Sequence, residues 1–249
     1  MKIKQMLVWN WKAFWTSLAV VMAIMLAINL LLVGLLSFIP GGEEGTANTT
    51  EVTTIVMSVT IGIVGFSGGL RFGGANGVSR RSVYWGYLGF GLTYSAALVI
   101  GFAAIDLLFS WSGMMNNNQI FRLTYGAWMQ SRPAWQVGLA QFLDKGVLCV
   151  MGSMLGYFLG GAFYRLGKVG KIVLAAGVPA LIAFFIPIVL FVLPDSVRTW
   201  LLKAVTQLWS FIAASPLNGA VFMLVFAAAF AVFSWLLIRR APVTPAPNK

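Results

Sequence analysis

Six long apolar segments run through this sequence and decide what kind of structure it can form. None of them contains Asp, Glu, Lys or Arg, and they cover about residues 13–39, 52–70, 82–105, 146–164, 172–193 and 215–238. An α-helix of about 20 apolar residues crosses the hydrocarbon core of a bilayer while keeping every backbone N–H and C=O group hydrogen-bonded. We therefore predict an all-α integral membrane protein with six transmembrane helices.

The composition agrees with this class and leaves no room for a separate soluble domain. Of the 249 residues, 59% are hydrophobic and only 9% are charged, and the mean hydropathy is +0.88. Soluble domains carry about 25% charged residues. We predict a single transmembrane domain over residues 1–240, whose first segment is retained as a signal anchor, and a disordered Pro-rich tail over residues 241–249.

The charged residues are distributed unevenly between the two sides of the predicted spans. The net charge is +11. If the N-terminus is cytoplasmic, twelve of the 17 Lys and Arg residues fall in cytoplasmic segments, and all six acidic residues fall on the other side. This is the positive-inside bias of membrane proteins, so we predict that both termini face the cytoplasm. The same distribution accounts for the basic charge without a nucleic-acid partner.

Two further segments have amphipathic helical patterns. In residues 1–15, apolar side chains recur at helical spacing beside three lysines. They predict either a helix lying in the cytoplasmic interface, which we favour, or an N-terminal extension of the first span. Between the fifth and sixth spans, an apolar stripe opposite polar residues predicts an outer amphipathic or re-entrant helix. The first pattern consists of Ile3, Leu7, Trp11 and Phe14, and the second of Val197, Trp200, Leu201, Ala204, Leu208 and Ile212.

Glycines and prolines predict how two of the spans are shaped. Gly152, Gly156 and Gly160 follow one another every four residues in the fourth span. They lie on one face of that helix and allow another helix to approach closely. That helix belongs either to this chain, which we favour, or to a second copy. Pro179 and Pro187 each remove a backbone donor from the fifth span and predict a kink or break there.

Few polar residues lie within the predicted spans. Asn29, Thr60, Thr93 and Ser95 are the candidates for a substrate path. Each serves equally as an interhelical hydrogen-bonding group, which is the interpretation that we favour.

Acidic residues fall at the ends of the third and fourth spans. Asp106 closes the third span, and Asp144 with Lys145 opens the fourth, so we expect them to anchor these ends at the interface. A carboxylate truly buried at membrane depth would instead indicate a functional site, and this alternative is kept open for Asp106.

The sequence lacks the residues of several kinds of catalytic and binding site. There is no His, and Cys149 is the only cysteine, which excludes a Cys/His zinc site and a disulfide. Ser67 lies in a GxSG sequence like that of rhomboid-type intramembrane proteases, but no His is present to act as its base. A GxxxxGK[ST] loop for nucleotide phosphates is also missing. We expect no catalytic site, no metal site and no cofactor bound by this chain.

A Gly-rich, basic stretch over residues 68–86 joins the second and third spans. Arg71, Arg80 and Arg81 are its only charges. Its central residues are Asn76, Gly77, Val78, Ser79, Arg80, Arg81 and Ser82. Ser79 is placed to cap a short helix that begins after Gly77. The arginines either fix the topology or bind a partner, and the density of Gly and Ser favours a partner.

With six spans, cytoplasmic termini and the sequence NGVSRR in this loop, the chain resembles the permease subunits of type 2 ABC exporters. Permeases of Gram-positive peptide exporters and of lantibiotic-immunity transporters are among them. The resemblance implies that residues 76–82 form a short coupling helix that docks into a separate ATPase subunit, which binds ATP and Mg²⁺. The short loop after the first span departs from relatives that carry a large extracellular domain there.

The resemblance further implies two copies of this permease with two ATPase chains in a bacterial cytoplasmic membrane. The exported substrate would be amphipathic or hydrophobic, with a peptide favoured. Two other classes remain open on the sequence alone. One is a self-contained secondary transporter or channel, and the other is a membrane immunity or scaffold protein that transports nothing.

Overall fold

The computed structural model describes residues 3–36, 49–111, 119–166, 170, 172–173 and 192–241. All regular secondary structure in these ranges is helical, as the apolar periodicity predicts. The helices are α1 (Ile3–Leu36), α2 (Thr49–Ala75), α3 (Arg80–Trp111), α4 (Gln119–Gln130), α5 (Ala134–Arg165), α9 (Asp195–Ala213) and α10 (Pro216–Arg239).

Among the described residues, five helical segments are long and apolar enough to cross a membrane. They are Ile3–Ile24, Glu51–Ala75, Arg80–Leu107, Ala134–Arg165 and Pro216–Arg239. These segments fit a multi-pass membrane protein. The fifth predicted span, 172–193, lies almost entirely outside the described residues, as do Pro179, Pro187 and nearly all of the predicted tail. Six spans therefore stay a prediction.

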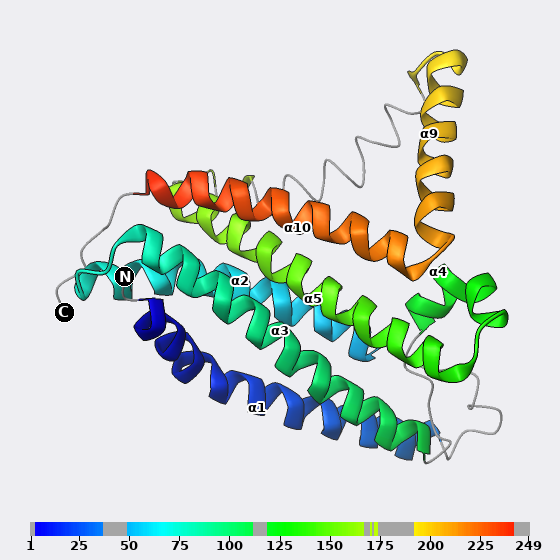
Figure 1. Cartoon of the computed structure of the whole chain (residues 1–249), viewed down its shortest axis with the longest axis horizontal. Coiled ribbons are helices and arrows are strands. Elements are labelled where there is room, and N and C mark those ends of the chain that lie inside the picture. Colours follow the sequence, from blue (N-terminus) through cyan, green and yellow to red (C-terminus); the bar gives the residue numbers. More distant parts are fainter. Residues whose placement is uncertain are drawn as a thin grey trace.

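The long helices lie side by side and form an elongated bundle (Figure 1). We call one end the basic end, because it holds the turn between α2 and α3 and the C-termini of α5 and α10. The other end, which holds α4 and the first turns of α2, α5 and α10, we call the acidic end. Helix α5 makes its most extensive contacts with α2 and α10, whereas α1 packs mainly against α3.

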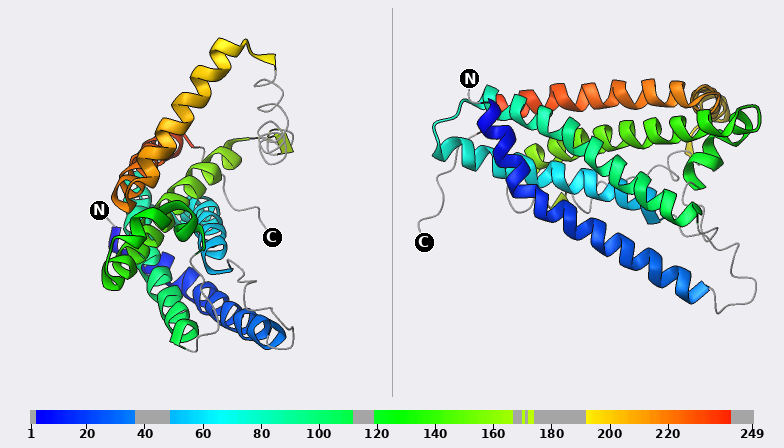
Figure 2. Two further views of the ribbon diagram at one scale, coloured as in Figure 1. Left: turned by 90° about the vertical axis from the view of Figure 1, so that its right-hand side faces the viewer. Right: turned by 60° about the horizontal axis from the view of Figure 1, so that its bottom comes forward.

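The N-terminal segment is part of α1 and not a separate surface helix. A single helix runs from Ile3 to Leu36, although its N-terminal part is turned relative to the rest (Figure 2). Met6, Asn10, Phe14 and Leu18 follow one another every four residues and are all buried. This stripe packs against the bundle and the segment is continuous with the first span, while its place in the cytoplasmic interface stays a prediction.

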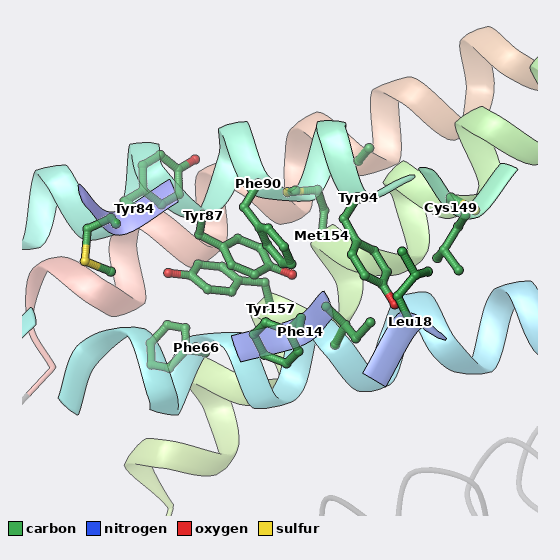
Figure 3. Close-up of a cluster of buried hydrophobic side chains, with 14 of the residues drawn as sticks. Phe14, Leu18, Phe66, Tyr84, Tyr87, Phe90, Tyr94, Cys149, Met154 and Tyr157 are labelled. Carbon is green, nitrogen blue, oxygen red and sulfur yellow. The ribbon is translucent and has the colours of Figure 1, made fainter. Parts of the chain in front are cut away.

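Aromatic side chains fill the centre of the bundle (Figure 3). The rings of Tyr87 on α3 and Tyr157 on α5 are stacked, with centroids 3.8 Å apart, and Phe66 of α2 packs against Tyr157 at 5.0 Å. The hydroxyl of Tyr87 donates a hydrogen bond to the carbonyl of Ser153 over 3.3 Å. One aromatic cluster thus joins α2, α3 and α5.

Glycines bring the backbones of α2 and α5 into direct contact. Gly152, Gly156 and Gly160 all face α2 of the same chain. A Cβ atom on Gly156 would lie 2.1 Å from the carbonyl oxygen of Val59, which is far inside van der Waals contact. Only a residue without a side chain fits there, so the glycine pattern determines how α2 and α5 pack.

Helix α9 differs from the others because it projects away from the bundle. It lies crosswise to α10 and meets it at the acidic end (Figures 1 and 2). None of its residues is buried. The sequence therefore predicted this helix correctly, while a re-entrant position of it stays a prediction.

Replacing Gly156 by Ala should destabilise the protein, whereas the same change at Gly146 should not. Both glycines lie in α5, but a Cβ on Gly146 meets no atom within 4 Å. Gly156→Ala forces α2 and α5 apart and should cost about 1–3 kcal/mol. Gly146→Ala should leave the stability unchanged or raise it by up to about 1 kcal/mol, through helix propensity. Unfolding midpoints in one detergent measure both; equal midpoints would contradict this packing.

Candidate functional site

The turn between α2 and α3 is short and tightly built. Gly77 has a positive φ of 60°, which ends α2. The N–H group of Val78 donates to the carbonyl of Gly73 over 2.8 Å, and that of Gly77 donates to Gly74 over 3.5 Å. These two bonds form a Schellman motif, in which a glycine in the left-handed region satisfies the last carbonyls of a helix.

Only two residues, Val78 and Ser79, separate Gly77 from the start of α3 at Arg80. Ser79 is its N-cap, because its Oγ accepts a hydrogen bond from the N–H group of Ser82 over 3.3 Å. The resemblance implied a separate coupling helix here. The structure has a four-residue connection instead, since the Schellman motif and the N-cap leave no room for another helical turn. Arg80 and Arg81 therefore belong to the first turn of α3.

Two arginines at the basic end bind the C-terminus of α10. Arg80 Nη1 donates to the carbonyl of Arg239 over 2.7 Å, and Arg165 Nη2 of α5 donates to that of Arg240 over 2.9 Å. The last carbonyls of a helix lack intrahelical donors and carry partial negative charge, so cations stabilise them. Arg80 therefore has a structural role within the chain.

The remaining residues of the turn are on the surface. Asn76, Gly77, Ser79 and Arg81 are exposed, Val78 is half-buried and Ser82 is buried. The glycines around the turn also have packing roles, because a Cβ on Gly73 or on Gly86 would clash with a neighbouring side chain. The high Gly content of the turn therefore does not by itself indicate a partner. The exposed charge of Arg81 is the feature that supports one.

The polar residues predicted to line a substrate path are not brought together as a group. Thr93 accepts a hydrogen bond from the indole N–H group of Trp11 over 3.2 Å, which joins α3 to α1. Thr60 is exposed and donates to the carbonyl of Val56 in its own helix. Ser95 is buried, and the side chain of Asn29 lies outside the described part. Thr93 thus acts as the interhelical group that we favoured.

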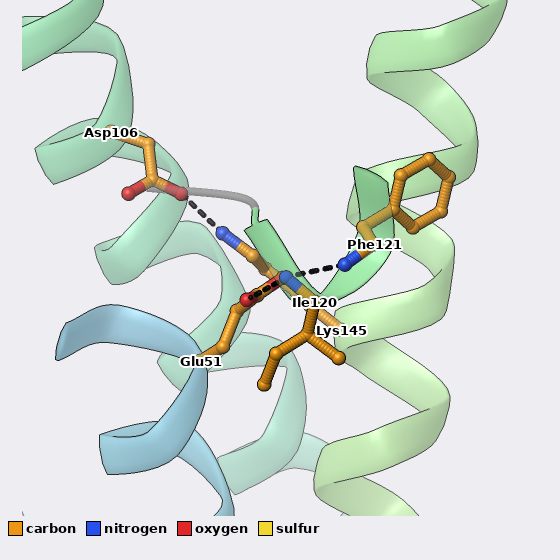
Figure 4. Close-up of polar contacts among 5 residues, drawn as sticks. All are labelled: Glu51, Asp106, Ile120, Phe121 and Lys145. Carbon is orange, nitrogen blue, oxygen red and sulfur yellow. Dashed lines mark hydrogen bonds and ion pairs between the residues drawn. The ribbon is translucent and has the colours of Figure 1, made fainter. Parts of the chain in front are cut away.

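A cluster of charged side chains lies at the acidic end and was not predicted. Glu51, in the first turn of α2, is buried, and its carboxylate accepts hydrogen bonds from the N–H groups of Ile120 and Phe121 over 2.9 and 3.3 Å (Figure 4). These are first-turn amides of α4, where the partial positive charge of a helix N-terminus favours an anion. Glu51 therefore holds α4 against α2.

Asp106 of α3 and Lys145 of α5 form an ion pair in the same cluster (Figure 4). Their side chains are only 16% and 7% exposed, whereas the pair of Asp195 and Arg198 in α9 is 84% and 41% exposed. Both residues also lie within candidate membrane spans. Lys145 is thus buried and Asp106 half-buried, and the two residues pair with each other in addition to lying near span ends. A functional role of the Asp106 carboxylate stays a prediction.

Two carboxylate oxygens of this cluster have no hydrogen-bond partner within the described part of the chain. They are Asp106 Oδ1 and Asp144 Oδ1. Tyr125 of α4 is buried beside them, and burial, with a smaller contribution from the charge of Asp144, raises its pKa to about 12. Its phenol therefore stays protonated at neutral pH. With three carboxylates and one ammonium group, the cluster has a negative formal charge.

Helix lengths explain why sequence reasoning missed this cluster. Helix α3 continues to Trp111 and α5 begins at Ala134, so both extend beyond the predicted spans 82–105 and 146–164. The extra turns bring Asp106 and Lys145 inside the bundle, where they pair. The available signal was that an acid directly follows one long apolar segment and a base directly precedes the next, which favours pairing when both ends are buried.

The described residues contain no group of three or more Asp, Glu, Cys or His side chains that could hold a metal ion. The charged side chains at the acidic end instead form an ion pair, between Asp106 and Lys145, and a cap, in which Glu51 binds the first amides of α4. No protein-family model matches the chain, and no curated protein or solved structure matches it either.

Lys145→Met should destabilise the protein strongly, because it leaves the carboxylate of Asp106 buried without a counter-charge. Removing one partner of a buried pair costs about 3–5 kcal/mol. The double variant Asp106→Asn with Lys145→Met should recover much of this loss, since no unpaired charge remains. Unfolding midpoints in detergent at neutral pH measure all three proteins.

The exposed pair of Asp195 and Arg198 provides the matched control. Arg198→Met should change the stability by less than about 1 kcal/mol, because solvent screens that pair. If Lys145→Met were no more harmful than Arg198→Met, the ion pair at the acidic end would not be buried as described.

Proposed function

We propose that this chain is the membrane subunit of an ATP-driven exporter and is powered by a separate ATPase that docks at the turn between α2 and α3. The observation that carries the proposal is the exposed basic turn at one end of a bundle of long apolar helices. Residues 76–81 present an exposed arginine on a backbone fixed by the Schellman motif and by the N-cap Ser79. A rigid exposed turn of this kind suits docking by a protein partner.

The turn is also connected to three helices, which suits a role in coupling. It ends α2, begins α3 and binds the C-terminus of α10 through Arg80. Displacement of the turn would therefore move these helices together. Because Arg80 is engaged with Arg239 within the chain, we assign the main contact with the ATPase to Arg81, supported by Asn76 and Val78.

The other parts of the proposal follow from the resemblance noted for the sequence. Two copies of the chain pair with two ATPase subunits, which bind ATP and Mg²⁺, in a bacterial cytoplasmic membrane. The basic end faces the cytoplasm, in agreement with the positive-inside rule. The substrate is amphipathic or hydrophobic, with a peptide favoured, because the spans offer an apolar path with few charges.

A second candidate function is ion-coupled secondary transport by the chain alone. The observation that favours it is the buried pair of Asp106 and Lys145, with unpartnered oxygens on Asp106 and Asp144. Ionisable groups within membrane spans commonly belong to ion or proton pathways. The cluster lies at one end of the bundle, however, and the path residues predicted from the sequence do not continue it toward the other end.

Arg81→Glu should abolish binding of the ATPase. We expect an adjacent gene to encode this ATPase; co-expressed with the tagged chain, it should co-purify with it. Charge reversal at a docking contact costs several kcal/mol, so the captured ATPase should fall by at least about tenfold. Arg122→Glu is the matched control, because Arg122 is an equally exposed arginine in α4 at the acidic end, and it should leave capture unchanged.

Transport into vesicles then separates the two functions. Under the proposal, uptake of a fluorescent amphipathic peptide into inside-out vesicles requires ATP and is lost in Arg81→Glu. It persists when a protonophore removes the proton gradient. Uptake that follows the proton gradient without ATP, and survives Arg81→Glu, would refute the proposal and favour secondary transport.

A further inference from the structure

Helix α9 (Asp195–Ala213) has two clearly separated faces. At about 100° per residue, its polar side chains gather in one narrow sector. That sector consists of Ser196, Thr199, Lys203, Thr206, Gln207 and Ser210. The apolar side chains cover more than half of the circumference. They are Val197, Trp200, Leu201, Leu202, Ala204, Val205, Leu208, Trp209, Phe211 and Ile212.

The two tryptophans of α9 lie at opposite borders of the apolar sector. Trp200 adjoins the polar sector on one side, and Trp209 lies near its other edge. They are 66% and 57% exposed, so the described part of the chain leaves both borders largely uncovered. Arg198 also falls near the Trp209 border, and its guanidinium reaches back to Asp195. Lys203 occupies the middle of the polar sector, opposite the apolar face.

The position of α9 in the fold places the helix at one end of the bundle, crosswise to the long helices. The helix lies crosswise to α10 and is joined to it by a short link at the acidic end (Figure 1). Because α10 is a candidate membrane span, a helix crosswise to it runs along the membrane plane. The first turns of α10 are also strongly exposed, with Leu217 at 70% and Val221 at 58%. Exposed apolar side chains thus occur both on α9 and at the start of the candidate span that follows it.

We propose that α9 lies in the phospholipid interface at the acidic end of the bundle, parallel to the membrane surface. Its apolar sector enters the boundary of the acyl chains, Trp200 and Trp209 lie at the level of the headgroups, and Lys203 faces the water and the lipid phosphates. Tryptophan favours this level of a bilayer, and a lysine opposite the apolar face is typical of interfacial helices.

The width of the apolar sector and the place of Lys203 decide between lipid and other surroundings. A second copy of the helix would cover only a narrow apolar stripe and leave most of the sector in water, whereas a lipid interface covers all of it. A re-entrant position would bury Lys203 and the hydroxyls of the polar sector in hydrocarbon, at a cost of several kcal/mol. This proposal does not depend on the ATPase partner.

Spin labels on opposite faces of α9 test the proposal in liposomes of phosphatidylethanolamine and phosphatidylglycerol. One variant carries Leu208→Cys in the apolar sector, and the matched variant carries Thr206→Cys in the polar sector. Both positions are exposed, so the variants should fold. Cys149 is 0% exposed, and wild-type protein controls for its labelling.

Accessibility to oxygen, which concentrates in lipid, is compared with accessibility to a water-soluble nickel complex. The ratio of oxygen to nickel accessibility should be several-fold higher at Leu208 than at Thr206. Equal access of nickel to both labels would overturn the proposal, because α9 would then lie in water. Low access of both probes at Leu208 with spin–spin broadening would show a second copy. High oxygen access at both positions would show re-entrant insertion.

Discussion

The direct contact between α2 and α5 is the constraint on which the rest of the bundle depends. Gly156 allows its helix to approach the backbone of Val59, and neighbouring glycines extend this contact along both helices. Only at this separation do the rings of Phe66 and Tyr157 meet, and only then does Tyr87 of α3 stack on Tyr157. In a membrane, packing must supply the association that the hydrophobic effect supplies in water, so close contact matters more than apolar character.

The sequence predicted the helices well because their determinants are local. Runs of apolar residues must be helical in a bilayer, glycines at intervals of four residues must share a helix face, and an amphipathic period identifies α9. The limits of the helices were less predictable. Charged residues near both ends of α3 and α5 were taken as span boundaries, although Asp106 and Lys145 are accommodated inside the bundle by pairing with each other. Such pairing joins distant segments, so neither charge shows it when its own span end is considered alone.

In the basic turn, too, contacts between residues close in the sequence could be predicted, whereas contacts between distant residues could not. Ser79 was predicted to cap a short helix that begins after Gly77, and the structure shows it as an N-cap, although of α3 and not of a separate helix. The contact of Arg80 with the end of α10 could not, because it joins residues 159 positions apart. The glycines of this region suggested docking, yet Gly73 and Gly86 are required by packing against neighbouring side chains. Of the features that favoured a partner at this turn, only its exposed surface still supports one.

Helix α3 is held to α5 at the acidic end and to α10 at the basic end, by interactions of unequal strength. At the acidic end, Asp106 and Lys145 form a buried ion pair, whereas at the basic end Arg80 and Arg165 each bind a C-terminal carbonyl of α10 from an exposed position. Separating the buried pair costs about 3–5 kcal/mol, but an exposed hydrogen bond exchanges with water at about 1 kcal/mol. The bond of Arg80 to α10 is therefore weaker than the ion pair, and one turn further along α3 the hydroxyl of Tyr84 adds a hydrogen bond to the carbonyl of Ala231. In the proposed exporter, the weaker bond of Arg80 lies at the basic end, which is also the end at which the ATPase docks.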